Sequence, residues 1–200
     1  VLRDGVPYAE LEATDAPTVR FQSGSVITRS FSGVLRKPLA QINWFTDRSR
    51  PQMWLHHWSD WLESAEGSFC GWSDPSHGGL KGTLPPWGRS ITTTYCCFEY
   101  CRDLVGTFPE WTDAITDACG TYQHVNLAGS IPKWGKNIVR CGFCYNDCQA
   151  VTGRCPPWPR NCVEFNSCYK GCTGLHGEIP PWPECGEELD SVYKGCTGAI

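Results

Sequence analysis

The stretch LHGEIPPW, which begins at Leu175, decides the fold because the chain repeats it. Four earlier copies read LKGTLPPW from Leu80, LVGTFPEW from Leu104, LAGSIPKW from Leu127 and VTGRCPPW from Val151. Successive copies are separated by 24, 23, 24 and 24 residues. A fixed period in this range is typical of repeat architectures, in which each unit buries its apolar face against its neighbours.

Three positions are identical in all five copies: a Gly, a Pro and a Trp. The apolar residues of the unit alternate with period two, which predicts a short strand with Leu175 and Ile179 facing inward. The Pro that follows ends the strand because it has no N–H to donate. The five tryptophans are Trp87, Trp111, Trp134, Trp158 and Trp182. They either pack between repeats or form an exposed aromatic strip for a protein or glycan partner.

A second block precedes the Leu position. Cys stands three residues before it in four units, and an aromatic residue stands six before it. Counting back from Leu127 places His124 at the Cys position and Thr121 at the aromatic position, which favours a core role for His124 over a catalytic one. The predicted core of the repeat is Leu80, Leu104, Leu127, Val151 and Leu175 with Cys101, Cys148, Cys172 and Cys196.

The combined pattern, aromatic-x-x-Cys-x-x-Leu-x-x-x-Ile-Pro, resembles the BspA-like class of bacterial surface leucine-rich repeats. The segment YKGCTGLHGEIP, which begins at Tyr169, is close to the unit of that family. The resemblance covers residues 80–200 and implies a leucine-rich-repeat solenoid with a parallel sheet on one face. It also implies an extracellular or cell-surface role in adhesion and protein recognition, without specifying a ligand.

Residues 1–52 lack the repeat. Strand-like alternation in residues 19–21 and 25–35 predicts a small antiparallel β region. This segment, together with INWFTDRSRP from Ile42, resembles structural proteins of tailed phages of Gram-positive bacteria. That resemblance implies a virion component that carries a repeat module.

Residues 53–79 are expected to form a helical cap or linker before the repeats. Trp54, Leu55, Trp58 and Leu62 fall at helical spacing, which predicts one helix over residues 51–67. The favoured interpretation is a cap over the open end of the solenoid, and the alternatives are a helix on a membrane surface or in a partner groove. Acidic residues on the polar side of this helix, Asp60, Glu63 and Glu66, argue against an anionic membrane.

The chain has 14 cysteines, which indicate disulfides, a metal site or a repeated core position. The segment CGFC from Cys141 alone is compatible with zinc or redox chemistry. However, Cys144 and Cys148 match Cys168 and Cys172 in the next unit, and equivalent positions in a ladder do not converge on one metal ion. Disulfides between adjacent units stay open for the cysteines that share no repeat position: Cys96, Cys119, Cys141, Cys155, Cys162 and Cys185.

Composition and motifs narrow the function. A net charge of −4 argues against nucleic acid as the main partner, and no apolar run reaches the roughly 20 residues of a membrane span. The chain has no zinc-protease, nucleophile-elbow or phosphate-loop motif, so we expect no catalytic site, metal or cofactor. We expect an extracellular recognition or adhesion module that binds a protein or glycan through one face of the repeats. The alternative is a structural subunit of a phage tail or surface filament that assembles through the solenoid ends.

Overall fold

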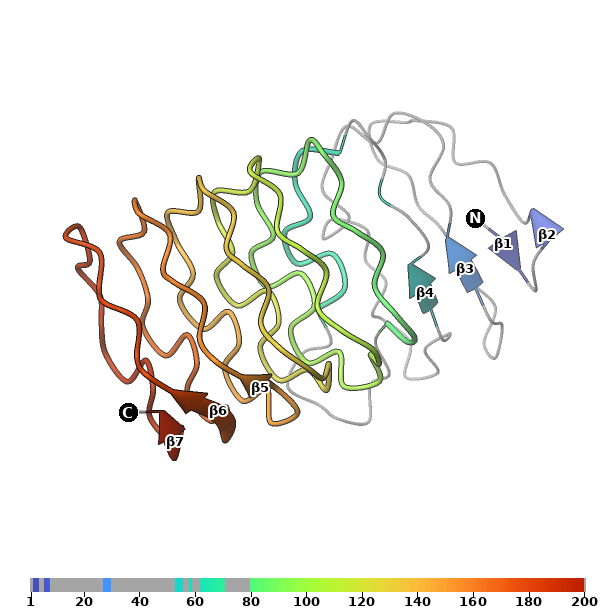
Figure 1. The fold of residues 1–200 in the computed structure, drawn as a ribbon. Coiled ribbons are helices and arrows are strands. Elements are labelled where there is room, and N and C mark those ends of the chain that lie inside the picture. Colours follow the sequence, from blue (N-terminus) through green and yellow to red (C-terminus); the bar gives the residue numbers. More distant parts are fainter. Residues whose placement is uncertain are drawn as a thin grey trace.

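Successive passes of the chain lie side by side along one axis in the computed structural model (Figure 1). We call the pass from one Leu position to the next a coil. The structure describes residues 2–3, 6–7, 27–29, 53–55, 58, 62–70 and 80–199. No α-helix occurs in these ranges, and so none of them holds a helix long and apolar enough to cross a membrane.

The strands are short and form two sheets. The first has the order β2-β1-β3-β4 and the second the order β5-β6-β7. In the first sheet β1 pairs antiparallel with β2 and β3, whereas β3 and β4 are parallel. The second sheet is parallel throughout. The strands are β1 Leu2–Arg3, β2 Val6–Pro7, β3 Ile27–Arg29, β4 Met53–Leu55, β5 Thr152–Gly153, β6 Gly174–Gly177 and β7 Gly198–Ala199.

Parallel pairing sets the register between neighbouring coils. Gly153 of β5 pairs with Leu175 of β6, and isolated bridges join Gly82 to Leu104 and Gly129 to Val151 in the same way. The Leu positions of successive coils therefore form one row along the stack. All five residues of this row are completely buried: Leu80, Leu104, Leu127, Val151 and Leu175. Ile179 differs from the inward orientation predicted for it, because it is 37% exposed.

A second ladder runs along another side of the stack, where single bridges link consecutive coils in parallel. Its members are Ser64, Thr93, Asp117, Arg140, Glu164 and Glu188. In the turn that follows this ladder, every second N–H donates to the next coil. For example, the N–H groups of Phe98 and Tyr100 donate to the carbonyls of Thr121 and Gln123, each at 2.9 Å. These inter-coil bonds satisfy backbone groups that the short strands leave unpaired.

Aromatic rings from successive coils stack in the interior. Phe98 stacks on Tyr122 with ring centres 5.8 Å apart, and Tyr122 stacks on Tyr145 at 5.6 Å. Tyr122 is completely buried, so it holds the aromatic position, and the assignment of Thr121 to that position is wrong. The Cys position three residues later is held by Val125, which is also completely buried, and the assignment of His124 to it is wrong as well.

The predicted helix over residues 51–67 is also wrong where the structure describes this stretch. Met53–Leu55 is strand β4, and residues 64–69 form a bridge and turns. The helix-like spacing arises because a turn-rich coil faces the core every three or four residues. Later coils repeat this spacing at Trp87, Ile91, Thr94 and Phe98 without forming a helix.

The side-chain rows continue upstream of Leu80, across the boundary that we expected between a cap and the repeats. Trp58 stacks on Trp87 with centres 5.2 Å apart, and Phe69 stacks on Phe98 at 5.8 Å. Phe69 precedes Phe98 by 29 residues, and the extra length lies between Phe69 and Leu80. The residues 19–21 of the expected β region lie outside the described ranges, whereas β3 lies within residues 25–35.

Candidate recognition surface

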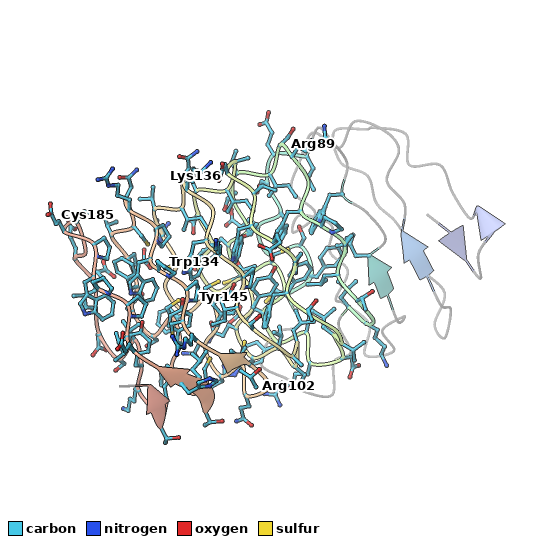
Figure 2. The ribbon with its side chains drawn as sticks, viewed as in Figure 1. Arg89, Arg102, Trp134, Lys136, Tyr145 and Cys185 are labelled. Carbon is cyan, nitrogen blue, oxygen red and sulfur yellow. The ribbon has the colours of Figure 1, made fainter. Side chains whose placement is uncertain are left out.

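The five repeat tryptophans form a column inside the stack. Neighbouring indole rings stack at centre separations of 5.8, 5.6, 6.3 and 5.4 Å from Trp87 to Trp182. The first four are buried, whereas Trp182 in the last coil is 41% exposed. Figure 2 shows Trp134 and Tyr145 in the middle of the stack, away from the rims marked by Lys136 and Arg102. The column therefore presents a single exposed ring, that of Trp182.

Hydrogen bonds tie this column to the aromatic stack. The indole N–H of Trp111 donates to the hydroxyl of Tyr145 at 2.9 Å, and that of Trp134 donates to the hydroxyl of Tyr169 at 3.1 Å. Each bond joins one coil to the next. A buried indole N–H loses its bond to water, so the tyrosine hydroxyl supplies the partner that makes burial of the ring favourable.

The repeated cysteines are also interior hydrogen-bond donors. The thiols of Cys101, Cys148, Cys172 and Cys196 lie 2.9, 2.9, 3.0 and 2.9 Å from the carbonyl oxygens of Phe69, Tyr122, Tyr145 and Tyr169. Burial raises the pKa of the Cys148 thiol, so it stays protonated and unreactive at neutral pH. No group of three or more His, Cys, Asp or Glu side chains in the described ranges is arranged to hold a metal ion.

The surface feature that most resembles a binding site lies in the turn of each coil, two residues after the stacked aromatic residue. There, three consecutive coils place Tyr100, His124 and Asp147 in contact, and we call these residues the ridge. The rings of Tyr100 and His124 stack with centres 4.4 Å apart and an interplanar angle of 16°. Nδ1 of His124 lies 3.5 Å from Oδ2 of Asp147. All three residues are half-buried, so each contributes both packing and an accessible polar edge.

The side chains of the ridge stand on strained backbone, as do those of Cys96, Phe143, Ser167 and Ser191 in the row four residues earlier. Tyr100, His124 and Asp147 have φ values of 60°, 58° and 55°, in the left-handed region that costs an L-residue roughly 1–2 kcal/mol. The next two coils place Gly171 and Gly195 at this position, with φ values of 78° and 86°. Glycine occupies this conformation without that cost. Side chains kept at strained positions are a reason to look for function there.

Charges next to the ridge make its chemistry mixed. The guanidinium carbon of Arg102 lies 5.9 Å from the ring centre of Tyr100. Burial lowers the pKa of His124, while the carboxylate of Asp147 opposes this shift. His124 is therefore mainly neutral at pH 7, when its imidazole can donate one hydrogen bond and accept another. The ridge thus combines a phenol ring, a neutral imidazole ring, a carboxylate and a nearby cation.

The bridge ladder on another side of the stack carries charges that satisfy one another. Arg140 lies 2.9 Å from Asp117 and 2.7 Å from Glu164, so one cation joins three coils. Tyr95 and Phe143 are exposed aromatic side chains in the turn that follows this ladder. The charges of Asp117, Arg140 and Glu164 on this side are therefore paired with one another.

Sequence reasoning missed the ridge. The segment from the aromatic residue to the Leu position is one residue shorter between Tyr122 and Leu127 than between Phe98 and Leu104. Counting back from Leu127 therefore assigned His124 to the core. Counting forward from the aromatic residue would have aligned His124 with Tyr100 and Asp147. Comparison with protein-family models, with curated proteins and with solved structures finds no match to this chain.

Proposed function

We propose that this chain is a non-enzymatic recognition module with a leucine-rich-repeat-like solenoid, which binds a glycan or a protein on a cell surface. The BspA-like pattern of the sequence supports the class and the extracellular location. The rows of aligned side chains support recognition, because a ligand that lies across several coils meets one side chain from each coil at a regular interval.

The observation that carries the proposal is the ridge. Its three side chains come from three coils, contact one another and are held at backbone positions where glycine is the unstrained choice. The same column uses glycine at Gly171 and Gly195, which avoids the backbone cost. The contacts among Tyr100, His124 and Asp147 hold the geometry of the ridge before a ligand binds.

The chemistry of the ridge favours a glycan. Sugar rings bind proteins through C–H faces that pack on aromatic rings and through hydroxyl groups that donate to carboxylates. Tyr100 and His124 supply the rings, while Asp147 accepts from hydroxyls and Arg102 donates to them. A protein partner is the alternative, since Tyr and Arg are also enriched at the centres of protein interfaces.

A binding assay with matched variants tests the proposal. The double variant Tyr100→Gly/His124→Gly removes both rings and introduces the residue that the same position carries at Gly171. Phe143→Gly is the control, because it removes an exposed aromatic side chain from a left-handed position four residues before the ridge position. On an array of bacterial and animal surface glycans, we expect the double variant to bind at least tenfold more weakly and the control to bind normally.

Two results would count against this assignment. If the double variant and the unmodified protein bind the same glycans equally, the ridge is not the site. If neither binds glycans but the unmodified protein binds deglycosylated cells, the partner is a protein.

A second candidate function is assembly through coil ends. In the last described coil, Ile179, Trp182 and Leu189 are 37%, 41% and 41% exposed. In the preceding coil, Trp158 stands at the position of Trp182 and Phe165 at that of Leu189, and these two side chains are 8% and 0% exposed. Either a further coil of the chain or a second copy seated on this coil would bury the exposed apolar area, and the second arrangement would support a filament or tail subunit. Light scattering of the pure protein separates the functions: a particle mass that stays monomeric as concentration rises contradicts assembly.

A further inference from the structure

Two thiols in the core contact each other directly. The sulfur atoms of Cys141 and Cys162 lie 3.4 Å apart, and both residues are completely buried. They belong to adjacent coils, since the N–H of Cys141 donates to the carbonyl of Glu164 at 2.9 Å. A bond between these two sulfurs would therefore join one coil to the next.

The repeat itself provides the comparison that makes this contact informative. Four residues after each of six tryptophans, from Trp58 to Trp182, the chain places Leu62, Ile91, Ile115, Ile138, Cys162 and Gly186. The position of Cys141 is held in the other coils by Ala65, Thr94, Ala118, Phe165 and Leu189. Each of these two rows thus contains one cysteine. The two cysteines, Cys141 and Cys162, contact each other. Independent replacement of an aliphatic core residue by cysteine would not select two positions in contact.

This pair also differs from the cysteines that recur in the repeat. Cys148 and its equivalents donate their thiols to carbonyl oxygens of the preceding coil, which gives each of them a structural role as a thiol. The Cys141 thiol instead contacts the sulfur of Cys162, and Cys162 also lies 3.6 Å from the carbonyl oxygen of Glu164 in its own coil. The repeated row explains why Cys148 is a cysteine, and it does not explain Cys141 or Cys162.

We propose that Cys141 and Cys162 form a disulfide that links adjacent coils when the protein folds in an oxidising compartment. The oxidant is a small disulfide of the glutathione class. The thiolate of one cysteine attacks a sulfur of the oxidant, forms a mixed disulfide and releases one glutathione thiolate. The second cysteine loses its proton, attacks the protein sulfur of the mixed disulfide and releases the second glutathione. Two protein thiols are oxidised and one glutathione disulfide is reduced to two glutathione molecules.

Burial determines when this reaction takes place. It raises the pKa of the Cys141 thiol well above its usual value, so the thiolate that must attack is scarce in the folded protein. The oxidant also cannot reach completely buried sulfur atoms. We therefore expect the bond to form during folding, and to form slowly when oxidant is added to folded, reduced protein.

Peptide mapping of the full chain tests the proposal. The protein is refolded with a mixture of reduced and oxidised glutathione, free thiols are alkylated, and the linked peptides are identified by mass spectrometry. Cleavage after Arg140, Arg154, Arg160 and Lys170 places Cys141, Cys144 and Cys148 on one peptide and Cys162 and Cys168 on another, so fragmentation must identify the linked cysteine in each peptide. We expect a link between Cys141 and Cys162 that disappears on reduction. Recovery of both as alkylated thiols, or a link from Cys141 to Cys168, would overturn the proposal.

Variants taken from the repeat supply the second measurement. Cys162→Ile restores the residue that Ile138 supplies in the preceding coil, and Cys141→Ala restores that of Ala118. Cys148→Val is the control, because Val125 already holds that position in another coil. Oxidation should raise the Tm of the unmodified protein and of the control by about 5–10 °C and leave the two other variants unchanged. An equal rise in Cys162→Ile would contradict the proposal. This inference concerns the core and does not depend on the ligand of the ridge.

Discussion

The tryptophan column and the ridge each take one residue from every coil, yet they differ in almost every other respect. The column has Trp in all five copies, and four of those rings are buried. The ridge position changes from Tyr100 to His124 to Asp147 and then to glycine, and its side chains reach the surface. Inside the stack, each ring is fixed by the rings above and below it, so a different residue would leave a gap or a clash. On the ridge the side chains also contact one another, but they are half-buried, so this constraint is weaker.

This contrast indicates where to look for function in a repeat protein. Positions that are identical in every coil satisfy the packing of one coil on the next. Positions that change between coils are free to match a ligand, which is not itself periodic. The ridge is a half-buried position that changes between coils, and three of its five residues are not glycine despite a left-handed conformation.

The largest effect should come from removing a ring in the middle of the tryptophan column. Trp134 stacks between Trp111 and Trp158 and donates to the hydroxyl of Tyr169. Trp134→Ala should lower the free energy of unfolding by about 3–5 kcal/mol, because it leaves a cavity and an unpaired buried hydroxyl. Urea unfolding followed by circular dichroism measures this change.

Trp182→Ala is the matched control for this prediction. Its ring stacks on Trp158 on one side and is 41% exposed, so its removal should cost clearly less than the removal of Trp134. Equal losses for the two variants would mean that burial in the column does not determine the contribution of a ring.

The repeat period and the inward row of Leu residues can be read from the sequence because they recur at nearly constant intervals. Two length changes limit that reading. The one-residue deletion after Tyr122 shifted His124 and Thr121 by one position, and the longer connection after Phe69 hid the coil that contains Trp58. Periodicity alone also cannot distinguish a helix from a turn-rich coil, since both place Leu55, Trp58 and Leu62 inward.

An intermediate effect is expected from adding a side chain to the part of the ridge column that lacks one. A Cβ on Gly171 would overlap Oδ1 of Asp147, and its φ of 78° disfavours any L-residue. Gly171→Ala should therefore lower the free energy of unfolding by about 1–3 kcal/mol. The same substitution at Gly195 is the control, because its φ is 86° but the nearest atoms to an added Cβ are 3.6 Å away.

The overlap can be separated from the backbone cost. In the Asp147→Gly background the carboxylate is gone, so Gly171→Ala should cost no more than Gly195→Ala does. If the loss at Gly171 is the same with and without the Asp147 side chain, the carboxylate does not lie over this glycine, and the geometry of the ridge is different from the one described.

The smallest predicted effect is a pH dependence of stability that arises from His124 on the ridge and not from the tryptophan column. Burial lowers the pKa of His124 in the folded protein, whereas the unfolded chain keeps the ordinary value of about 6.5. Above that value His124 is neutral in both the folded and the unfolded state, and its contribution to stability is fully present. As the pH falls from 7 towards 5, the unfolded state binds the proton first, so the folded state loses stability. In His124→Gly this loss should be absent, while the other histidines of the chain still titrate. Urea midpoints of the two proteins at pH 7 and pH 5 measure the difference. A larger drop in the variant would mean that Asp147 dominates over burial and raises the pKa of His124, which would make the imidazole a cation when the ridge binds its ligand.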